Sequence, residues 1–121
     1  IKALLKLRAP FNITNLTLKA AIVALSDDVF VQASVKENFE QMRAYEAFAK
    51  ELGFKTIESY TNFIVLEFDA DKSSSAIAQK LMEKGIIVRN LGAYGMNAIR
   101  VTIGTPEQNE RFFECFKTIY M

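Results

Sequence analysis

The stretch from residue 86 to residue 108 constrains the fold most, because it contains two predicted strands with a glycine-rich loop between them. The β-branched residues at 86–88 lead to Arg89 and indicate a short first strand. After the loop, apolar residues alternate from Ile99 to Ile103, which is the period of a strand with one buried face. The stretch therefore predicts a strand, a loop and a second strand in direct succession.

A helix start follows the second strand. Thr105 precedes Pro106 and has Gln108 three positions further on, which is a capping box with proline at the first helical position. The second strand must therefore end near Gly104, and the helix is expected to run from Pro106 to about residue 120. Its aromatic residues share a face and predict core packing: Phe112, Phe113, Phe116 and Tyr120.

Arg100 lies in the middle of the second strand, and the alternation places it and Thr102 on the face opposite the apolar residues. A guanidinium group cannot lose its charge to escape desolvation, so Arg100 needs a carboxylate or a phosphate nearby. One interpretation is an internal ion pair with one of the 14 acidic residues of the chain. The other is an anionic ligand.

The rest of the chain predicts helices and strands that complete an α+β domain. We expect a mainly antiparallel sheet with helices on one face, formed by residues 1–121 as a single domain. The predicted strand at 62–68 is apolar on both faces, which indicates a place in the middle of the sheet. The predicted segments are helices at 14–25, 28–52 and 75–84, the last with Ile77, Leu81 and Met82 inward, and strands at 54–57 and 62–68.

The predicted helix at 28–52 is unusually long, roughly 37 Å at 1.5 Å per residue. Gly53 follows it as a C-terminal cap. Such a helix could bridge two domains or reach a partner subunit, or it could only pack across one sheet. Its apolar stripe consists of Val31, Val35, Phe39, Met42, Ala49 and Leu52.

Composition excludes several classes of function. The net charge of +1 and the lack of a basic run argue against a nucleic-acid partner. With no histidine, the chain cannot form His-dependent metal or nucleophilic sites, and no metal ligand set is expected. Cys115 is the only cysteine, which fits a reducing compartment and a structural role. No apolar run approaches 18 residues and no signal-peptide pattern is present, so we expect a cytoplasmic protein without a membrane partner.

The chain opens at Ile1, and residues 1–13 read as a connector in which Pro10 biases Ala9 toward an extended conformation. A frayed terminus with a turn at Pro10 is the alternative. We expect the chain to be a piece of a longer protein. The sequence does not assign a role to Asn12 or to Asn62.

Three segments resemble the fold-type I, pyridoxal-phosphate-dependent aminotransferases, and most closely the members that act on histidinol phosphate. They are GIIVRNLGAYGMNAIRVTIGTPEQN, RAPFNITNLTLKAAIVALSDD and ESYTNFIVLEF, which together span nearly the whole chain. The resemblance implies that residues 1–121 are the C-terminal small domain of such an enzyme, entered through the connector at 1–13. It also implies a homodimer, because enzymes of this superfamily build their active site at the subunit boundary.

The resemblance implies roles for three residues of this chain. Arg100 would grip the carboxylate of an amino-acid substrate or the phosphate of histidinol phosphate, and Arg89 would help to hold the distal anionic group. Tyr94 could donate a hydrogen bond to the phosphate, although a loop tyrosine more often packs on its own scaffold. The loop at 90–97, with two glycines, would adapt to histidinol phosphate or imidazole acetol phosphate and to glutamate or 2-oxoglutarate.

Transamination also needs a lysine that forms a Schiff base with pyridoxal 5'-phosphate. None of the ten lysines lies in the serine-lysine motif of the family, so we expect that lysine upstream of Ile1 and assign no catalytic or cofactor-binding residue here. The fragment alone is then expected to be inactive. Two alternatives stay open: another fold-type I enzyme, such as an aromatic aminotransferase or a threonine-phosphate decarboxylase, or a stand-alone small-molecule-binding regulatory module.

Overall fold

The computed structural model describes Lys6 and residues 13–120 of the chain. The predicted connector at 1–13 therefore lies almost wholly outside the described residues. The chain divides into two compact units, residues 1–33 and residues 34–121.

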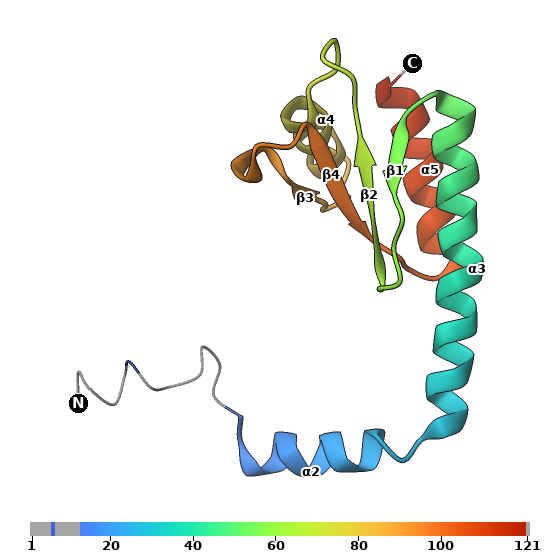
Figure 1. The fold of residues 1–121 in the computed structure, drawn as a ribbon, viewed down its shortest axis with the longest axis vertical. Helices are drawn as coiled ribbons and strands as arrows, with labels where there is room; N and C mark the ends of the chain where they lie inside the picture. The colour runs from blue at the N-terminus through green and yellow to red at the C-terminus, as the bar shows by residue number, and fades with distance from the viewer. Residues whose placement is uncertain (1–5, 7–12, 121) are drawn as a thin grey trace. The chain divides into compact units, whose positions relative to one another are not determined.

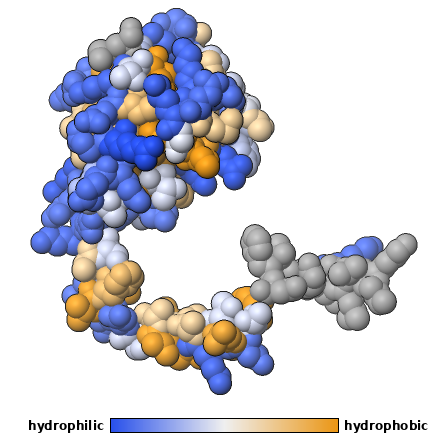
Figure 2. All heavy atoms as spheres, turned by 180° about the vertical axis from the view of Figure 1, so that it is seen from behind, coloured by the Kyte–Doolittle hydropathy of each residue, from blue (hydrophilic) through white to orange (hydrophobic). Residues whose placement is uncertain are grey.

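The first unit contains α2 (Asn15–Ala24) and the first turns of α3 (Asp28–Leu52). The predicted cap at Thr14 is confirmed, since its hydroxyl oxygen accepts a hydrogen bond from the backbone of Thr17 at 3.2 Å. All residues of α2 are exposed, including large apolar ones. Orange, apolar atoms gather over α2 and the start of α3 in Figure 2. A helix that is apolar on several sides is typical of a buried helix, so this surface fits a covered position.

The second unit is built on a four-stranded sheet of β1 (Lys55–Ile57), β2 (Phe63–Glu67), β3 (Arg89–Asn90) and β4 (Ala98–Thr102). The strand order is β1-β2-β4-β3, and each neighbouring pair is antiparallel. The C-terminal half of α3, together with α4 (Ser74–Glu83) and α5 (Pro106–Tyr120), lies on one face of the sheet (Figure 1). The predicted α+β class is confirmed, and β2 has the predicted internal place.

The core lies between that face of the sheet and the three helices. Alternate residues of β2 and β4 form the side of the core that belongs to the sheet. They are Ile64, Leu66, Ile99 and Val101, all buried. Aromatic side chains of α3 and α5 form the side of the core that belongs to the helices. The ring centroids of Phe48 and Phe116, for example, are 5.7 Å apart. Burying each such side chain contributes about 1.5 to 3 kcal/mol, so the predicted aromatic stripe of α5 is a main source of stability.

The predicted apolar stripe of α3 is only partly correct. Met42 and Ala49 are buried, but Val35 and Phe39 are 49% and 39% exposed. Tyr45 and Phe48, which the stripe omitted, are buried instead. The helix has its predicted bounds. Its buried residues all lie in its C-terminal half, and Val31, Val35 and Phe39 of its N-terminal half are exposed.

The predicted strand at 86–88 is wrong, because β3 consists of Arg89 and Asn90 alone. The backbone N–H of Ile86 donates to the carbonyl of Leu81 at 2.9 Å, which ties it to the end of α4. Ile87 is 86% exposed. Met82 was also expected inward, but it is 52% exposed, because it lies about 100° around the helix from the buried Leu81.

The predicted capping box at the start of α5 is confirmed in both directions. The N–H of Thr105 donates to the side-chain oxygen of Gln108 at 3.0 Å, and the N–H of Gln108 donates to the Thr105 hydroxyl at 3.4 Å. This box fixes where β4 ends and therefore where Arg100 lies along the sheet.

Candidate functional site

Arg89 and Arg100 are direct partners in the sheet. In the antiparallel pairing of β3 with β4, Arg89 lies opposite Arg100 and Asn90 lies opposite Ile99. Ile99 faces the core, so the two arginines project from the opposite face, away from the helices. Like charges in directly opposed positions destabilise a sheet, and an anion between them would relieve the repulsion.

The protein holds Arg100 in place without neutralising it. Its guanidinium carbon lies 4.7 Å from the centroid of the Phe63 ring, and Val65 is its partner on β2. Neither Arg89 nor Arg100 has a carboxylate within 4.0 Å in the described part of the chain, where the ion pairs join Lys36 to Glu40 and Lys117 to Glu51. The internal ion pair that the sequence left open is therefore not seen among these residues.

A concavity of about 490 Å³ lies at this pair of strands. Its lining is Ile87, Val88, Arg89, Asn90, Arg100 and Thr102. Two guanidinium groups offer planar, two-donor forks that match carboxylate and phosphate oxygens, and the Thr102 hydroxyl adds a further donor. This volume falls within the usual range for small-ligand sites. The arrangement can bind one phosphate or two carboxylates.

Tyr94 is not brought to this concavity. It ends the short 3-10 helix η1 (Gly92–Tyr94), is 73% exposed and does not line the space beside the arginines. Residues 91–95 of the loop at 90–97 form a hydrogen-bonded turn, and the adaptation of this loop to two substrates stays a prediction. The N–H of Tyr94 donates to the Leu91 carbonyl at 2.9 Å, and Gly95 has a φ of +77°, which favours glycine.

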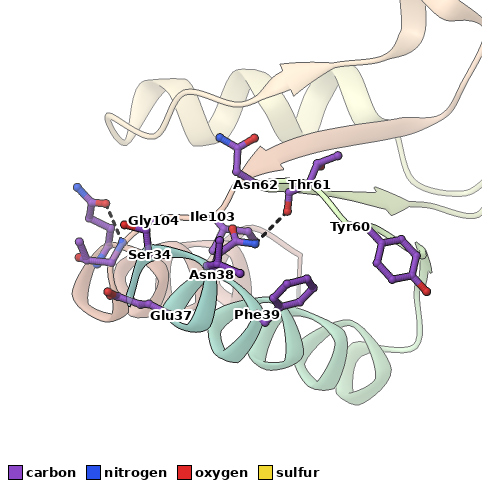
Figure 3. Close-up of a pocket in the computed structure, with 12 residues that line it drawn as sticks. Ser34, Glu37, Asn38, Phe39, Tyr60, Thr61, Asn62, Ile103 and Gly104 are labelled. Carbon is purple, nitrogen blue, oxygen red and sulfur yellow. Dashed lines mark hydrogen bonds between the residues drawn. The ribbon is translucent and has the colours of Figure 1, made fainter. Parts of the chain in front are cut away.

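A larger concavity, of about 630 Å³, lies between α3, the β1–β2 connection and the turn before α5 (Figure 3). Asn38 crosses its floor and donates to the carbonyl of Thr61 at 3.0 Å, and Asn62 lies on its wall. Its only charged lining residue is Glu37. Because it offers no cation, the smaller concavity at the arginines is the better candidate for an anionic substrate.

Two asparagines beside the arginines were missed by the sequence reasoning. Asn90 and Asn97 stand at the two ends of the loop, and their side chains make seven hydrogen bonds to the loop and to the region around the start of α4. An asparagine two residues before Gly92 is a turn signal that could have indicated the first of them.

The concavity at the arginines does not fit a pyridoxal-phosphate site, because no lysine and no carboxylate line it. In the part of the chain that the structure describes, no group of three or more acidic or cysteine side chains could hold a metal ion. None of the described helices combines the length and apolar character needed to cross a membrane.

The aminotransferase class I and II family model matches residues 1–116. The chain belongs to this family. It is similar to the histidinol-phosphate aminotransferases of Sulfurimonas denitrificans, with 59% identity over 114 residues, and of Campylobacter jejuni subsp. doylei, with 56% identity over 119 residues. These alignments cover 94% and 98% of the chain but 31% and 32% of the two relatives. The chain thus spans about a third of the length of the curated relatives it matches.

A solved structure shares the fold. The histidinol-phosphate aminotransferase of Sinorhizobium meliloti, in complex with pyridoxal-5'-phosphate, matches with a TM-score of 0.76 and 23% identity. The match covers 98% of this chain and 33% of that one. The fold of this family member is that of the small domain of fold-type I aminotransferases.

Proposed function

We propose that this chain is the C-terminal small domain of a pyridoxal-phosphate-dependent histidinol-phosphate aminotransferase. In this proposal the complete enzyme transfers an amino group between histidinol phosphate and 2-oxoglutarate, giving imidazole acetol phosphate and glutamate, in histidine biosynthesis. The names of relatives at 56% and 59% identity support the substrate. A cytoplasmic homodimer is part of the proposal.

The observation that carries the proposal is that two neighbouring arginines have no acidic partner among the described residues. Arg89 and Arg100 lie opposite one another, outside the core, with no carboxylate partner among the described residues. A phosphate monoester carries nearly two negative charges near neutral pH, and glutamate carries two carboxylates. The same two guanidinium groups can therefore serve either substrate, with Arg100 as the main grip and Arg89 for the second charge.

Arg100 is suited to orient a substrate because its position is fixed on both sides. β4 is hydrogen-bonded to β2 and β3, and the Phe63 ring supports the guanidinium. An anionic group held by a two-donor fork leaves few orientations for the amine at its other end. Tyr94 stays a weaker proposal, as a donor that would reach the phosphate only in the complete enzyme.

Pyridoxal 5'-phosphate is the proposed cofactor, held mainly by parts of the enzyme outside this chain. When bound, it supplies the electron sink for amino-group transfer. In this proposal the described residues of the chain bind and orient the substrate anion, and the proton transfers at the reacting carbon are left to groups outside them.

The proposal is tested with the full-length enzyme that carries this chain. We expect amino transfer from histidinol phosphate to 2-oxoglutarate, with aromatic amino acids as poorer donors and no decarboxylation of threonine phosphate. Arg89→Ala should raise KM for histidinol phosphate and glutamate far more than KM for an amino acid with an uncharged side chain. Equal activity on aromatic amino acids, or equal effects of Arg89→Ala on all donors, would contradict the proposal.

A further inference from the structure

β3 is too short to fix its own position. It pairs with β4 through only two residue pairs, and one of them sets Arg89 against Arg100. Opposed like charges weaken such a pairing, and the strand lies at the edge of the sheet with no neighbour on its other side. Contacts other than the strand pairing must therefore fix the position of Arg89 relative to Arg100.

Hydrogen bonds of the Asn90 side chain fix the position of β3. This side chain points to the core side of the sheet, where its Oδ1 accepts from the Ser74 hydroxyl at 3.2 Å and from the Gly92 N–H at 2.9 Å. Its Nδ2 donates to the Ser75 hydroxyl at 2.8 Å. One amide thus ties β3 to the first turn of α4 and to the loop. Gly92 makes room for it, since a Cβ there would lie 3.3 Å from Asn90 Oδ1.

Asn97 ties the other end of the loop to the same turn of α4. Its Oδ1 accepts from the backbone N–H of Ser74 at 2.9 Å. Its Nδ2 lies within 3.1 Å of three carbonyl oxygens, those of Phe68, Asp69 and Lys72. Both asparagines converge on Ser74, which is 3% exposed. The loop between the two arginines in the sequence is therefore hydrogen-bonded at both of its ends to Ser74.

We propose that Asn90 is a positioning residue for the anion site, acting through Arg89. By fastening β3 to α4, it sets the separation of the two guanidinium groups and so favours substrates with two negative charges. This inference rests on the proposed function of the arginine pair. Asn90 also lines the concavity, but its side-chain amide is engaged with the protein and is not free to bind the anion.

Steady-state kinetics of the full-length holoenzyme test the inference. Asn90→Ala should raise KM for histidinol phosphate and for glutamate about tenfold, with kcat little changed, because displacing a binding group by a fraction of an ångström misplaces the fork. In an Arg89→Ala background, Asn90→Ala should add no further rise, since the group that it positions is gone. Ser75→Ala removes a single bond to Asn90 and should give a smaller rise in KM. It serves as the second variant if Asn90→Ala does not fold.

Ser73→Ala is the matched control. Ser73 caps α4 by accepting from the N–H of Ala76 at 3.3 Å, but its side chain makes no hydrogen bond to Asn90 or Asn97. It should lower the melting temperature and leave KM unchanged. The inference is overturned if Ser73→Ala raises KM as much as Asn90→Ala, or if the effect of Asn90→Ala persists without Arg89. It is also overturned, with the proposed function intact, if Arg89→Ala raises KM and neither Asn90→Ala nor Ser75→Ala does. If Arg89→Ala changes nothing, the proposed function fails and this inference fails with it.

Discussion

Asn109 joins α5 to α3 and to the turn before α5 through buried hydrogen bonds. It is 2% exposed, and its Oδ1 accepts from the Tyr45 hydroxyl at 3.2 Å and from the Gly104 N–H at 3.0 Å. Its Nδ2 donates to Gln41 and to the Gly104 carbonyl. Asn109→Ala would leave several of these groups buried without partners, and we expect a loss of about 3 kcal/mol in the free energy of unfolding. Urea denaturation measures it, and a loss comparable to that of an exposed residue such as Glu110→Ala would contradict this assignment.

Tyr45 predicts a dependence of stability on alkaline pH. Burial raises the pKa of its phenol well above the ordinary value of 10.0. The unfolded chain can therefore ionise this group above about pH 10 while the folded chain resists, so the stability it contributes is complete below pH 10 and is lost as the pH rises. Tyr45→Phe should flatten the fall in unfolding free energy above pH 10 by up to about 1.4 kcal/mol per pH unit. Parallel curves for the two proteins would show that Tyr45 ionises normally.

Sequence reasoning found the two arginines but missed these buried polar residues. Arg100 is conspicuous because a charge interrupts an apolar alternation, which is visible along the chain. Tyr45 and Asn109 are 64 positions apart, and each looks like an ordinary helix residue until the fold brings them into contact. The pairing of Arg89 with Arg100 was unpredictable for the same reason, since it depends on the register of two strands.

At the scale of elements, a side chain at Gly104 would crowd the turn from β4 into α5. A Cβ at Gly104 would lie 2.5 Å from the side-chain oxygen of Gln108 and 3.3 Å from Asn109 Oδ1. Gly104→Ala should therefore break the capping box and crowd the Asn109 network, lowering stability by about 1 to 3 kcal/mol. Thr105→Ala, which removes only the capping hydroxyl, should cost about 1 kcal/mol and is the comparison. Equal melting temperatures for Gly104→Ala and the parent would show that the turn relaxes freely.

Helix ends were predictable because their signals are local. Gly53 and Gly85 end α3 and α4 with φ of +78° and +79°, and Thr105 and Gln108 start α5 as the sequence indicated. Strand ends and buried stripes were less predictable. Whether Ile86 joins a strand, or whether Val35 is covered, depends on how far neighbouring elements extend, and no local pattern records that.

At the scale of the whole molecule, the exposed apolar surface of α2 and of the first turns of α3 predicts association. Leu16, Ile22, Val29 and Phe30 are each at least 60% exposed. Patches of this kind are typical of surfaces that are covered in the working protein. We expect the isolated chain to self-associate in size-exclusion chromatography with light scattering, and an Ile22→Glu, Phe30→Glu variant to move toward the monomer. A monodisperse monomer for the parent chain would contradict this prediction.

The central claim is that Arg100 binds the anionic group of the substrate and does not serve as a structural ion-pair member. Steady-state kinetics of Arg100→Ala and Arg100→Lys in the full-length enzyme, with thermal melts without ligand, test it most directly. Loss of a charged two-donor partner costs about 2 to 4 kcal/mol of transition-state binding, so kcat/KM should fall roughly thirtyfold to thousandfold. Lysine should rescue little of this, because an ammonium group cannot reproduce the planar fork, and the melting temperature should change little. A melting temperature many degrees lower, with normal kinetics for the protein that stays folded, would contradict the account.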